Sequence, residues 1–293
     1  MRIVYFVLSA FWCVPMALAQ PFKLPDGREM TTVCGRTVPE TAVSVGRSFL
    51  GRPYVSHTLE EKGAEQLVVN WHEFDCTTFV ETISALSLAW HDLPDNRNAD
   101  RKNTDQLEGL FKKYLTKVRY RNGHIDGYAS RLHYFSEWLR DNERKGLLQD
   151  VTPLLAGNVT VSKSLSYMTA KTFRYPAMND PAVYRQIAHI ENTLSQEPFA
   201  FVPKKNLRKA EANLRDGDVV MLTASRPGLD MRHCGFAVWQ RGRVHLLHAS
   251  SDYGRVVITS QPLTEYVAAR KTLSGIRVAR FKTGPVALSA KAK

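Results

Sequence analysis

The order of helical and strand patterns along the sequence predicts an α+β fold. Apolar residues recur with helical spacing through the first two thirds of the 293 residues, whereas alternating patterns typical of strands cluster in the last third. Such an order favours helices packed on an antiparallel sheet. The length is sufficient for one large domain, which we expect to cover residues 20–282, between a leader peptide at 1–19 and a flexible tail at 283–293.

The apolar spacing predicts helices over residues 39–50, 76–90, 107–118 and 129–142. Alternation of apolar and polar residues predicts strands over residues 218–223, 233–240, 243–250, 255–259 and 275–280. The segment from about residue 92 to residue 210 is too long for a connection between elements. We therefore expect this segment to be a large helical insertion.

The first twenty residues are typical of a secretory signal peptide. They contain Arg2, an apolar run over residues 3–14 and a small-residue A-x-A site at 17–19. An uncleaved anchor is the alternative, although the run is too short to span a bilayer. We expect an exported, periplasmic protein with no integral membrane segment after cleavage. Three cysteines then remain, and an odd number in an oxidising compartment leaves at least one thiol unpaired.

The charge of the chain bears on the partners that it can bind. There are 40 basic and 28 acidic residues, which give a formal net charge of +12. This excess favours polyanionic partners such as cell-wall polymers or membrane head groups. The basic residues are scattered rather than clustered on one predicted helix, so nucleic-acid binding is not expected. No pattern specifies an oligomeric state.

The segment "FDCTTFVETISALSLAW", which begins at Phe74, places a cysteine at the start of a helix. Asp75 is a suitable N-cap, which makes Cys76 the first helical residue; in a second register Thr78 is the cap and Glu81 closes a capping box. In either register the thiol lies near free N–H groups and the positive end of the helix dipole, which lower a thiol pKa and can bind an oxyanion. The alternative is a buried structural cysteine, because Cys76 shares a helix face with apolar residues: Phe79, Val80, Ile83, Leu86 and Trp90.

A nucleophilic thiol needs a base and a group that orients the base, and two late strands supply histidines for both roles. In "MRHCGFAVWQRGRVHLLHASS", the Arg-Gly dipeptide at 241–242 predicts a two-residue hairpin loop. Strands paired directly beside this loop set Gly235 opposite His248 and place His233 on the same face as His248. His245 then points to the other face. A longer loop or a bulge would reverse this assignment.

We expect the helix of Cys76 to pack on the face that carries His233 and His248, which gives a Cys-His-His constellation. Cys234 alternates away from His233 and is expected in the core. Neither of two zinc patterns is present. The H-E pair at 72–73 lacks the second histidine of H-E-x-x-H because Cys76 occupies that position, and no two cysteines of the mature chain are close in sequence. The sequence therefore predicts no metal site.

Several motifs together carry a family resemblance. They are GRPYV at 51–55, FDCTTFVE at 74–81, GDVV at 217–220, HCGFAV at 233–238 and LLHASS at 246–251. In this combination and order the chain resembles the NlpC-type papain-like cell-wall cysteine hydrolases, and more closely their N-acetylmuramoyl-L-alanine amidase-like branch. The resemblance extends from about residue 38 to residue 280.

The resemblance implies a papain-like core, with an N-terminal nucleophile helix on an antiparallel sheet, and no metal or organic cofactor. It implies that Cys76 is the nucleophile, His233 the base and His248 the residue that orients the base. Tyr54 matches a tyrosine near the thiol whose hydroxyl helps to form the oxyanion site. Asp75 matches the acid that precedes the nucleophile.

Asp75, Arg131 and Asp230 are the candidate substrate-binding residues. The Arg131 guanidinium suits a substrate carboxylate or sugar oxygens, with a solvated helix arginine as the alternative. Asp230, three residues before His233, is expected either to brace its loop or to contact substrate. His57 departs from the small residues usual in the family after GRPYV, and we expect it either to crowd the cleft or to contact substrate.

The function that these expectations imply is an exported amidase that acts on peptidoglycan or muropeptides. It would cleave the amide between N-acetylmuramic acid and L-alanine through a thioester on Cys76. A γ-D-glutamyl-diamino acid endopeptidase is the alternative from the same fold. A wall-binding protein without activity and an acyltransferase with the same triad are further alternatives.

Overall fold

The structure, a computed structural model, describes residues 22–23, 29–30, 35–60, 63–94 and 101–282. The predicted leader, the predicted tail and Cys34 lie outside the described residues. Within the described part of the chain, no helix is both long and apolar enough to cross a membrane.

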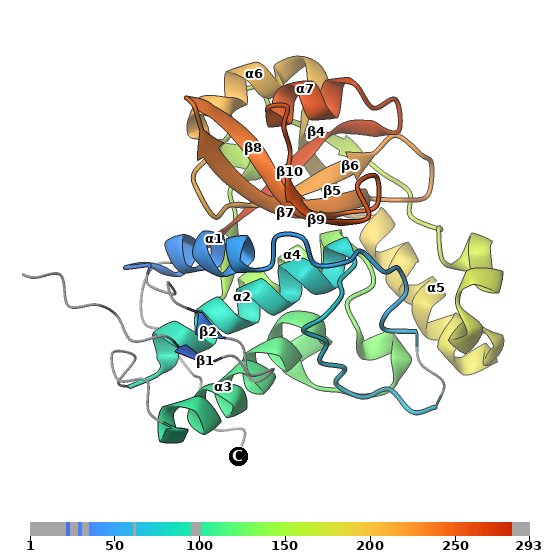
Figure 1. Cartoon of the computed structure of the whole chain (residues 1–293). Coiled ribbons are helices and arrows are strands. Elements are labelled where there is room, and N and C mark those ends of the chain that lie inside the picture. Colours follow the sequence, from blue (N-terminus) through green and yellow to red (C-terminus); the bar gives the residue numbers. More distant parts are fainter. Residues whose placement is uncertain (1–21, 24–28, 31–34, 61–62, 95–100, 283–293) are drawn as a thin grey trace, which may run out of the picture.

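An eight-stranded antiparallel sheet forms the upper half of the molecule in Figure 1. Its strands run in the order β4 (Val159–Ser162), β5 (Pro198–Pro203), β10 (Leu273–Phe281), β6 (Val219–Ala224), β7 (Met231–Gln240), β8 (Arg243–Ser250) and β9 (Arg255–Ile258), and β3 (Leu148–Asp150) pairs with the end of β10. β6 to β10 are the five strands that the alternation predicts, each within two residues of its expected bounds. Apart from this sheet, β1 (Phe22–Lys23) pairs with β2 (Glu29–Met30).

Helices cover both faces of the sheet (Figure 1). α1 (Val38–Ser48) and α2 (Cys76–Asp92) lie on one face, and α6 (Leu207–Ala210) and α7 (Leu263–Ala268) lie on the other. The Phe79 ring of α2 lies 6.1 Å from the Phe236 ring of β7, in the same buried cluster as Leu247 of β8. The opposite face buries other side chains of these strands with α6 and α7, among them Ala237, Leu246, Leu207 and Leu263. Because both faces are covered, the strands are apolar on both sides.

α2 is the central helix of the molecule. It is buried on every side from Thr78 to Trp90, between the sheet above it and α3 (Arg101–Arg119) below it. A buried charge needs a partner, and the buried carboxylate of Glu81 on α2 pairs with Arg119 of α3 at 2.6 Å. This ion pair fixes the lengthwise position of α2 and therefore the place of its N-terminus.

The segment from residue 92 to residue 210 is not wholly helical, and that expectation was wrong. It contains α3, α4 (Phe135–Arg144) and α5 (Pro181–Ser195), but also β3, β4 and β5, which extend the sheet beyond β10. These strands have only three to six residues, and pairing decides their conformation: β3 and β5 pair with β10, and β4 pairs with β5. Short 3₁₀ helices join the elements: η1 (Arg121–Gly123), η2 (Tyr128–Ser130), η3 (Thr152–Leu154), η4 (Thr169–Arg174), η5 (Pro176–Asn179), η6 (Lys204–Asn206) and η7 (Glu211–Asn213).

The helix predicted over residues 129–142 begins later, at Phe135. Arg131 is instead extended and forms an isolated bridge with Tyr120 at the end of α3. Asp230, from the loop before β7, accepts a hydrogen bond from the N–H of Ser136 in the first turn of α4, at 2.7 Å. This tertiary contact sets the start of the helix, because no residue beside α4 caps it with its own side chain.

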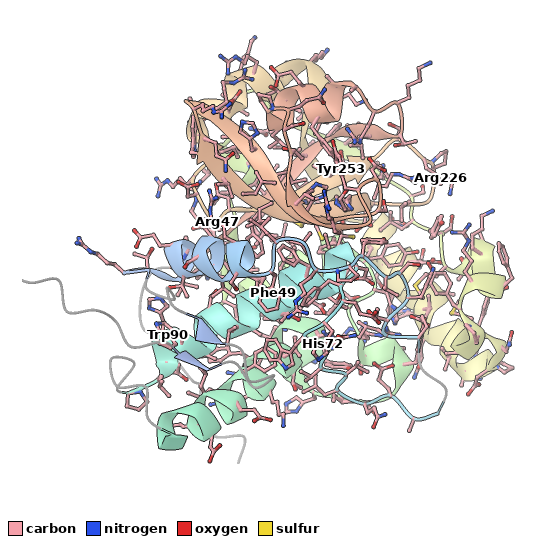
Figure 2. The ribbon with its side chains drawn as sticks, viewed as in Figure 1. Arg47, Phe49, His72, Trp90, Arg226 and Tyr253 are labelled. Atoms are coloured by element: carbon pink, nitrogen blue, oxygen red, sulfur yellow. The ribbon has the colours of Figure 1, made fainter. Side chains whose placement is uncertain are left out.

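An aromatic cluster holds the segment that leads into α2. Phe49, which Figure 2 labels close to α1 and α2, is fully buried and packs edge-on against Phe74 with ring centroids 5.2 Å apart. Phe74 in turn packs edge-on against Phe79, and its backbone bridges to Tyr54. The cluster therefore brings two distant parts of the sequence together directly before Cys76.

Candidate active site

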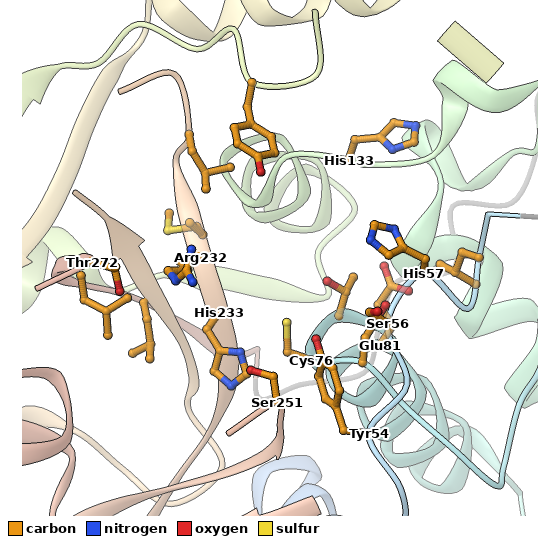
Figure 3. A pocket seen from close by; sticks show the side chains of 18 of the residues that line it. Tyr54, Ser56, His57, Cys76, Glu81, His133, Arg232, His233, Ser251 and Thr272 are labelled. Atoms are coloured by element: carbon orange, nitrogen blue, oxygen red, sulfur yellow. The ribbon is translucent and has the colours of Figure 1, made fainter. Parts of the chain in front are cut away.

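A cavity of about 600 Å³ opens between the N-terminus of α2 and the sheet (Figure 3). It brings together five of the seven residues that the sequence proposes for the site: Tyr54, Asp75, Cys76, Arg131 and His233. The other two residues, His248 and Asp230, do not line the cavity.

The cavity has two arms, which meet at Cys76 (Figure 3). We call the side with Arg232 and Thr272, beyond His233, the sheet arm. We call the side beyond Tyr54 the helical arm; it contains Ser56, His57, Glu60, Arg131 and His133.

The N-terminus of α2 is capped by Asp75, so the first of the two predicted registers is correct and the Thr78 cap is wrong. The Asp75 carboxylate accepts from the Thr78 N–H at 2.7 Å, and the Thr78 hydroxyl accepts from the Asp75 N–H at 3.0 Å. Cys76 is therefore the first residue of the helix, beside first-turn N–H groups that no carbonyl within the helix can satisfy. Burial, followed by the charge of Cys76, raises the pKa of Asp75 to about 6.

Cys76 and Cys234 are both free thiols, and they are direct neighbours. Cys234 is fully buried, as expected for a core residue, and its thiol donates to the carbonyl oxygen of Cys76 at 3.1 Å. A hydrogen bond from Cys234, followed by the charge and hydrogen bond of His233, holds the pKa of Cys76 well below its ordinary value, although burial opposes this shift. Burial and the neighbouring Cys76 raise the pKa of Cys234. The two thiols therefore differ in character: the first becomes a thiolate readily, and the second remains a donor.

His233 and His248 form a directly hydrogen-bonded pair. His233 Nε2 lies 2.5 Å from His248 Nδ1, and the rings meet edge-on with centroids 4.8 Å apart. His248 is fully buried, and burial, followed by the charges of His233 and Arg270, lowers its pKa well below the ordinary value. The unprotonated Nδ1 of a neutral His248 can accept a hydrogen bond from the Nε2–H of His233, which leaves His233 Nδ1 for the thiol.

The predicted hairpin register is correct. Gln240 pairs with Arg243 and Phe236 with Leu247, so that Gly235 follows opposite His248. A Cβ atom on Gly235 would lie 2.8 Å from the His248 Cβ, which is why a glycine is required there.

The expectation that α2 packs on the face of His233 and His248 is wrong. α2 packs on the opposite face, against Cys234 and Phe236. His233 reaches Cys76 at the end of the helix, where β7 is irregular. His233 pairs with Leu222 of β6, but the next pair joins Thr223 to Met231, so that one extra residue, Arg232, bulges from β7.

Tyr54 and His57 lie on the helical side of Cys76 (Figure 3). Burial, followed by the charges of Cys76 and Asp75, raises the pKa of Tyr54, so its hydroxyl remains a donor at neutral pH. His57 lines the cavity and has a positive φ of 63°, which costs energy for a residue with a side chain. The departure from small residues at this position therefore places an imidazole in the helical arm.

Arg131 is a buried, ion-paired residue rather than a solvated one. It is 6 % exposed, and its guanidinium lies 2.9 Å from Glu60 and 3.4 Å from Glu65. The guanidinium also stacks on the Tyr128 ring at 4.8 Å. Arg131 lines the helical arm, but two carboxylates already compensate its charge.

Asp230 does not line the cavity, so a direct contact with substrate is not supported. Its two carboxylate oxygens accept from the backbone N–H groups of Ser136 and Met231 at 2.7 and 2.6 Å. This geometry matches the other expected role, which is to brace the loop before β7 against α4.

Sequence reasoning missed three features of the site: the contact of Cys234 with Cys76, the Glu60–Arg131 pair and two other arginines that line the cavity, Arg232 and Arg270. Of these residues only Arg232 could have been proposed from the sequence, because it directly precedes His233. In the part of the chain that the structure describes, no group of three or more His, Cys, Asp or Glu side chains could hold a metal ion.

Fold and site together define an α+β protein in which a low-pKa cysteine at a helix N-terminus meets a pair of histidines. The sequence matches the family model of the AmiA-like proteins, described as N-acetylmuramoyl-L-alanine amidase-like, over residues 44–276. Since the match covers most of the chain, the protein belongs to this family. None of the curated proteins is significantly similar in sequence.

Solved structures agree with the family assignment. An N-acetylmuramoyl-L-alanine amidase from Bacteroides uniformis is 36 % identical, with a TM-score of 0.75 over 84 % of this chain and 99 % of that one. A Bacteroides fragilis protein described as "a putative xylanase" is 40 % identical, with a TM-score of 0.72 over 81 % of this chain and 99 % of that one. LPG0564 from Legionella pneumophila, of family DUF1460, is 22 % identical over 84 % of this chain and 90 % of that one; its TM-score of 0.59 shows a similar fold only.

Proposed function

We propose that the protein is a peptidoglycan amidase that cleaves the amide between N-acetylmuramic acid and L-alanine with Cys76 as its nucleophile. The observation that carries the proposal is the meeting of Cys76 and His233 in one cavity, with the thiol pKa lowered by its neighbours. The family assignment supplies the substrate class.

The first half of the reaction forms a thioester. The Cys76 thiolate attacks the lactyl carbonyl carbon and forms a C–S bond, while first-turn N–H groups of α2 and the Tyr54 hydroxyl stabilise the oxyanion. The C–N bond then breaks, and His233 gives its proton to the leaving nitrogen of L-alanine.

The second half returns the enzyme to its starting state. Water enters where the amine has left and gives a proton to His233 as it attacks the thioester carbonyl. The C–S bond breaks, the lactyl carboxylate of the sugar is released, and the Cys76 thiolate is restored. His248 holds the His233 ring in the orientation that both proton transfers need.

Glycosidase chemistry is the second possibility that a similar structure raises, through the name of the Bacteroides fragilis protein. It needs two carboxyl groups that face each other across the substrate. The four carboxylates that line the cavity are engaged elsewhere: Glu60 with Arg131, Asp75 with Thr78, Glu81 with Arg119 and Asp252 with Arg270. The cavity therefore favours the cysteine mechanism.

Digestion of purified muropeptides, followed by mass spectrometry, tests the proposal. Stem peptides that begin with L-alanine, together with the free amino sugar, are the expected products. A sugar that still carries L-Ala–D-Glu would instead identify an endopeptidase. Cleavage of glycosidic bonds, or no product at all beside an unreactive Cys76, would also overturn the proposal. The matched control is Cys76→Ala, which removes only the sulfur.

The proposed place of action is the periplasm, and the support is the N-terminal signal pattern. Cell fractionation tests this part separately. We expect the shortened chain in the periplasmic fraction, whereas a full-length chain in the cytoplasm would contradict it.

A further inference from the structure

Arg232 of the sheet arm is turned into the cavity by the bulge in β7. Successive residues of a regular strand point to opposite faces, so Arg232 and His233 could not both face one cavity. The pairings Leu222–His233 and Thr223–Met231 leave Arg232 as the extra residue, and both Arg232 and His233 line the cavity. Bulges of this kind change the direction of a side chain beside a site.

Arg232 differs from the other arginines of the cavity in having no partner. Arg131 is held by Glu60, and Arg270 is held by Asp252 at 2.6 Å. Arg232 is exposed, and its guanidinium forms no ion pair or hydrogen bond with any residue that the structure describes. Asp252, an acidic residue that also lines the cavity, forms its ion pair with Arg270. An uncompensated guanidinium thus faces the cavity directly beside His233.

The position of the base decides which part of the substrate lies in the sheet arm. His233 must give its proton to the nitrogen of the leaving peptide, so the leaving peptide has to extend on the His233 side of Cys76. Figure 3 shows Arg232 and Thr272 on that side, with Tyr54, His57 and His133 on the other. The sugar on the other side of the cleaved amide then lies in the helical arm.

The leaving peptide carries an anion within a short distance of the cleaved bond. Its second residue, D-glutamate, continues the stem through the γ-carboxyl group, so its α-carboxylate is free. Only the first stem residue, L-alanine, separates this carboxylate from the cleaved amide, and an extended chain advances about 3.3–3.6 Å per residue. The carboxylate therefore lies within the span of an arginine side chain next to His233. Arginine can bind a carboxylate through two parallel hydrogen bonds.

We propose that Arg232 binds the free α-carboxylate of the second stem residue and makes the enzyme selective for stems in which this carboxylate is not amidated. This inference rests on the proposed amidase function. It assigns the leaving peptide to the sheet arm and gives the bulge of β7 a role in substrate recognition.

The test compares two muropeptides that differ only at the second stem residue, D-glutamate in one and D-isoglutamine in the other. For the wild-type protein we expect kcat/KM to be ~10- to 100-fold higher with D-glutamate, because a charge-assisted bond of about 1.5–3 kcal/mol is lost with the amide. Arg232→Gln should lower kcat/KM for the D-glutamate substrate by a similar factor and change the D-isoglutamine substrate less than ~3-fold. Arg232→Lys should recover part of the preference, since it keeps the charge but not the two-pronged geometry.

The matched control is Arg241→Gln, at the far end of the same β7–β8 hairpin and outside the cavity, which should keep the wild-type preference. Equal cleavage of both substrates by the wild-type protein, or an equal loss on both in Arg232→Gln, would overturn this inference and leave the amidase function standing. Cleavage of neither substrate by the wild-type protein would overturn the amidase function, and this inference with it.

Discussion

In the helical arm of the cavity Arg131 is buried between two glutamates, whereas in the sheet arm Arg232 is exposed and has no partner among the described residues. An arginine therefore has a structural role on one side of Cys76 and is free to bind a ligand on the other. Removing Arg131 would leave two half-buried carboxylates without a counter-charge, so Arg131 stabilises the structure of its arm. Arg232 has little effect on the free energy of unfolding, and its guanidinium remains free to bind an anion.

The rest of each arm follows the same division. In the helical arm, burial and the nearby Arg131 keep the pKa of His133 well below its ordinary value, so this histidine adds no positive charge. The helical arm thus offers the uncharged His133 and the compensated guanidinium of Arg131, which suit a neutral sugar. The sheet arm offers an uncompensated positive charge, which suits a carboxylate. The difference shows how one cleft can bind two chemically distinct halves of a substrate.

The largest effect should come from Cys76, where the two arms meet. We expect Cys76→Ala to lower kcat by at least ~10⁴-fold, because the thioester cannot form. Binding of muropeptides should remain, since neither arm is altered. Isothermal titration with a muropeptide and the digestion assay check the two statements together; full activity in the variant would exclude Cys76 as the nucleophile.

His248 should have the next largest effect, because it acts on the reaction only through the orientation of His233. Loss of the acceptor in His248→Leu should lower kcat by ~10²- to 10³-fold, because His233 loses the partner that fixes its ring. His248→Asn, which keeps an acceptor oxygen, should recover part of the rate. KM should change little in both variants, and a change confined to KM would contradict the orienting role.

Arg131 and Arg232 can be compared directly through stability. Arg131→Met removes a buried guanidinium, leaves the half-buried Glu60 and Glu65 without their counter-charge and should lower the free energy of unfolding by about 3–5 kcal/mol. Arg232→Met should change it by less than about 0.5 kcal/mol, as for other exposed positions. Urea unfolding measures both. Equal losses would remove the distinction between the two arms.

The smallest effect concerns the contact between the two cysteines, which joins the sheet to the start of α2. Cys234→Ala removes the hydrogen bond that does most to lower the pKa of Cys76, so this pKa should rise and alkylation should begin at higher pH. The pH dependence of alkylation, followed by mass spectrometry on the peptide that contains Cys76, reports the shift. Cys234→Ser keeps a donor and should remain near the wild-type value; a shift as large as that of the alanine variant would exclude the hydrogen bond as the cause.

Local rules were enough to predict the two chemical components of the site. The cap depends on a few consecutive residues, and both registers that the sequence allowed set Cys76 beside the first turn of α2; the structure has the register capped by Asp75. The register of the β7–β8 hairpin depends on a two-residue loop and on alternation, and it placed His233 and His248 together. Both predictions concern neighbours in sequence or across one turn, where backbone geometry leaves few choices.

Only the tertiary structure decided how these components meet. An apolar stripe on α2 requires a partner, but both faces of the sheet are apolar, so the sequence could not choose the face of Cys234 over that of His233. The bulge at Arg232, the Glu60–Arg131 pair and the cap that Asp230 provides for α4 all join residues far apart in the sequence. Their geometry depends on packing and on the pairing of buried charges, which no local pattern records.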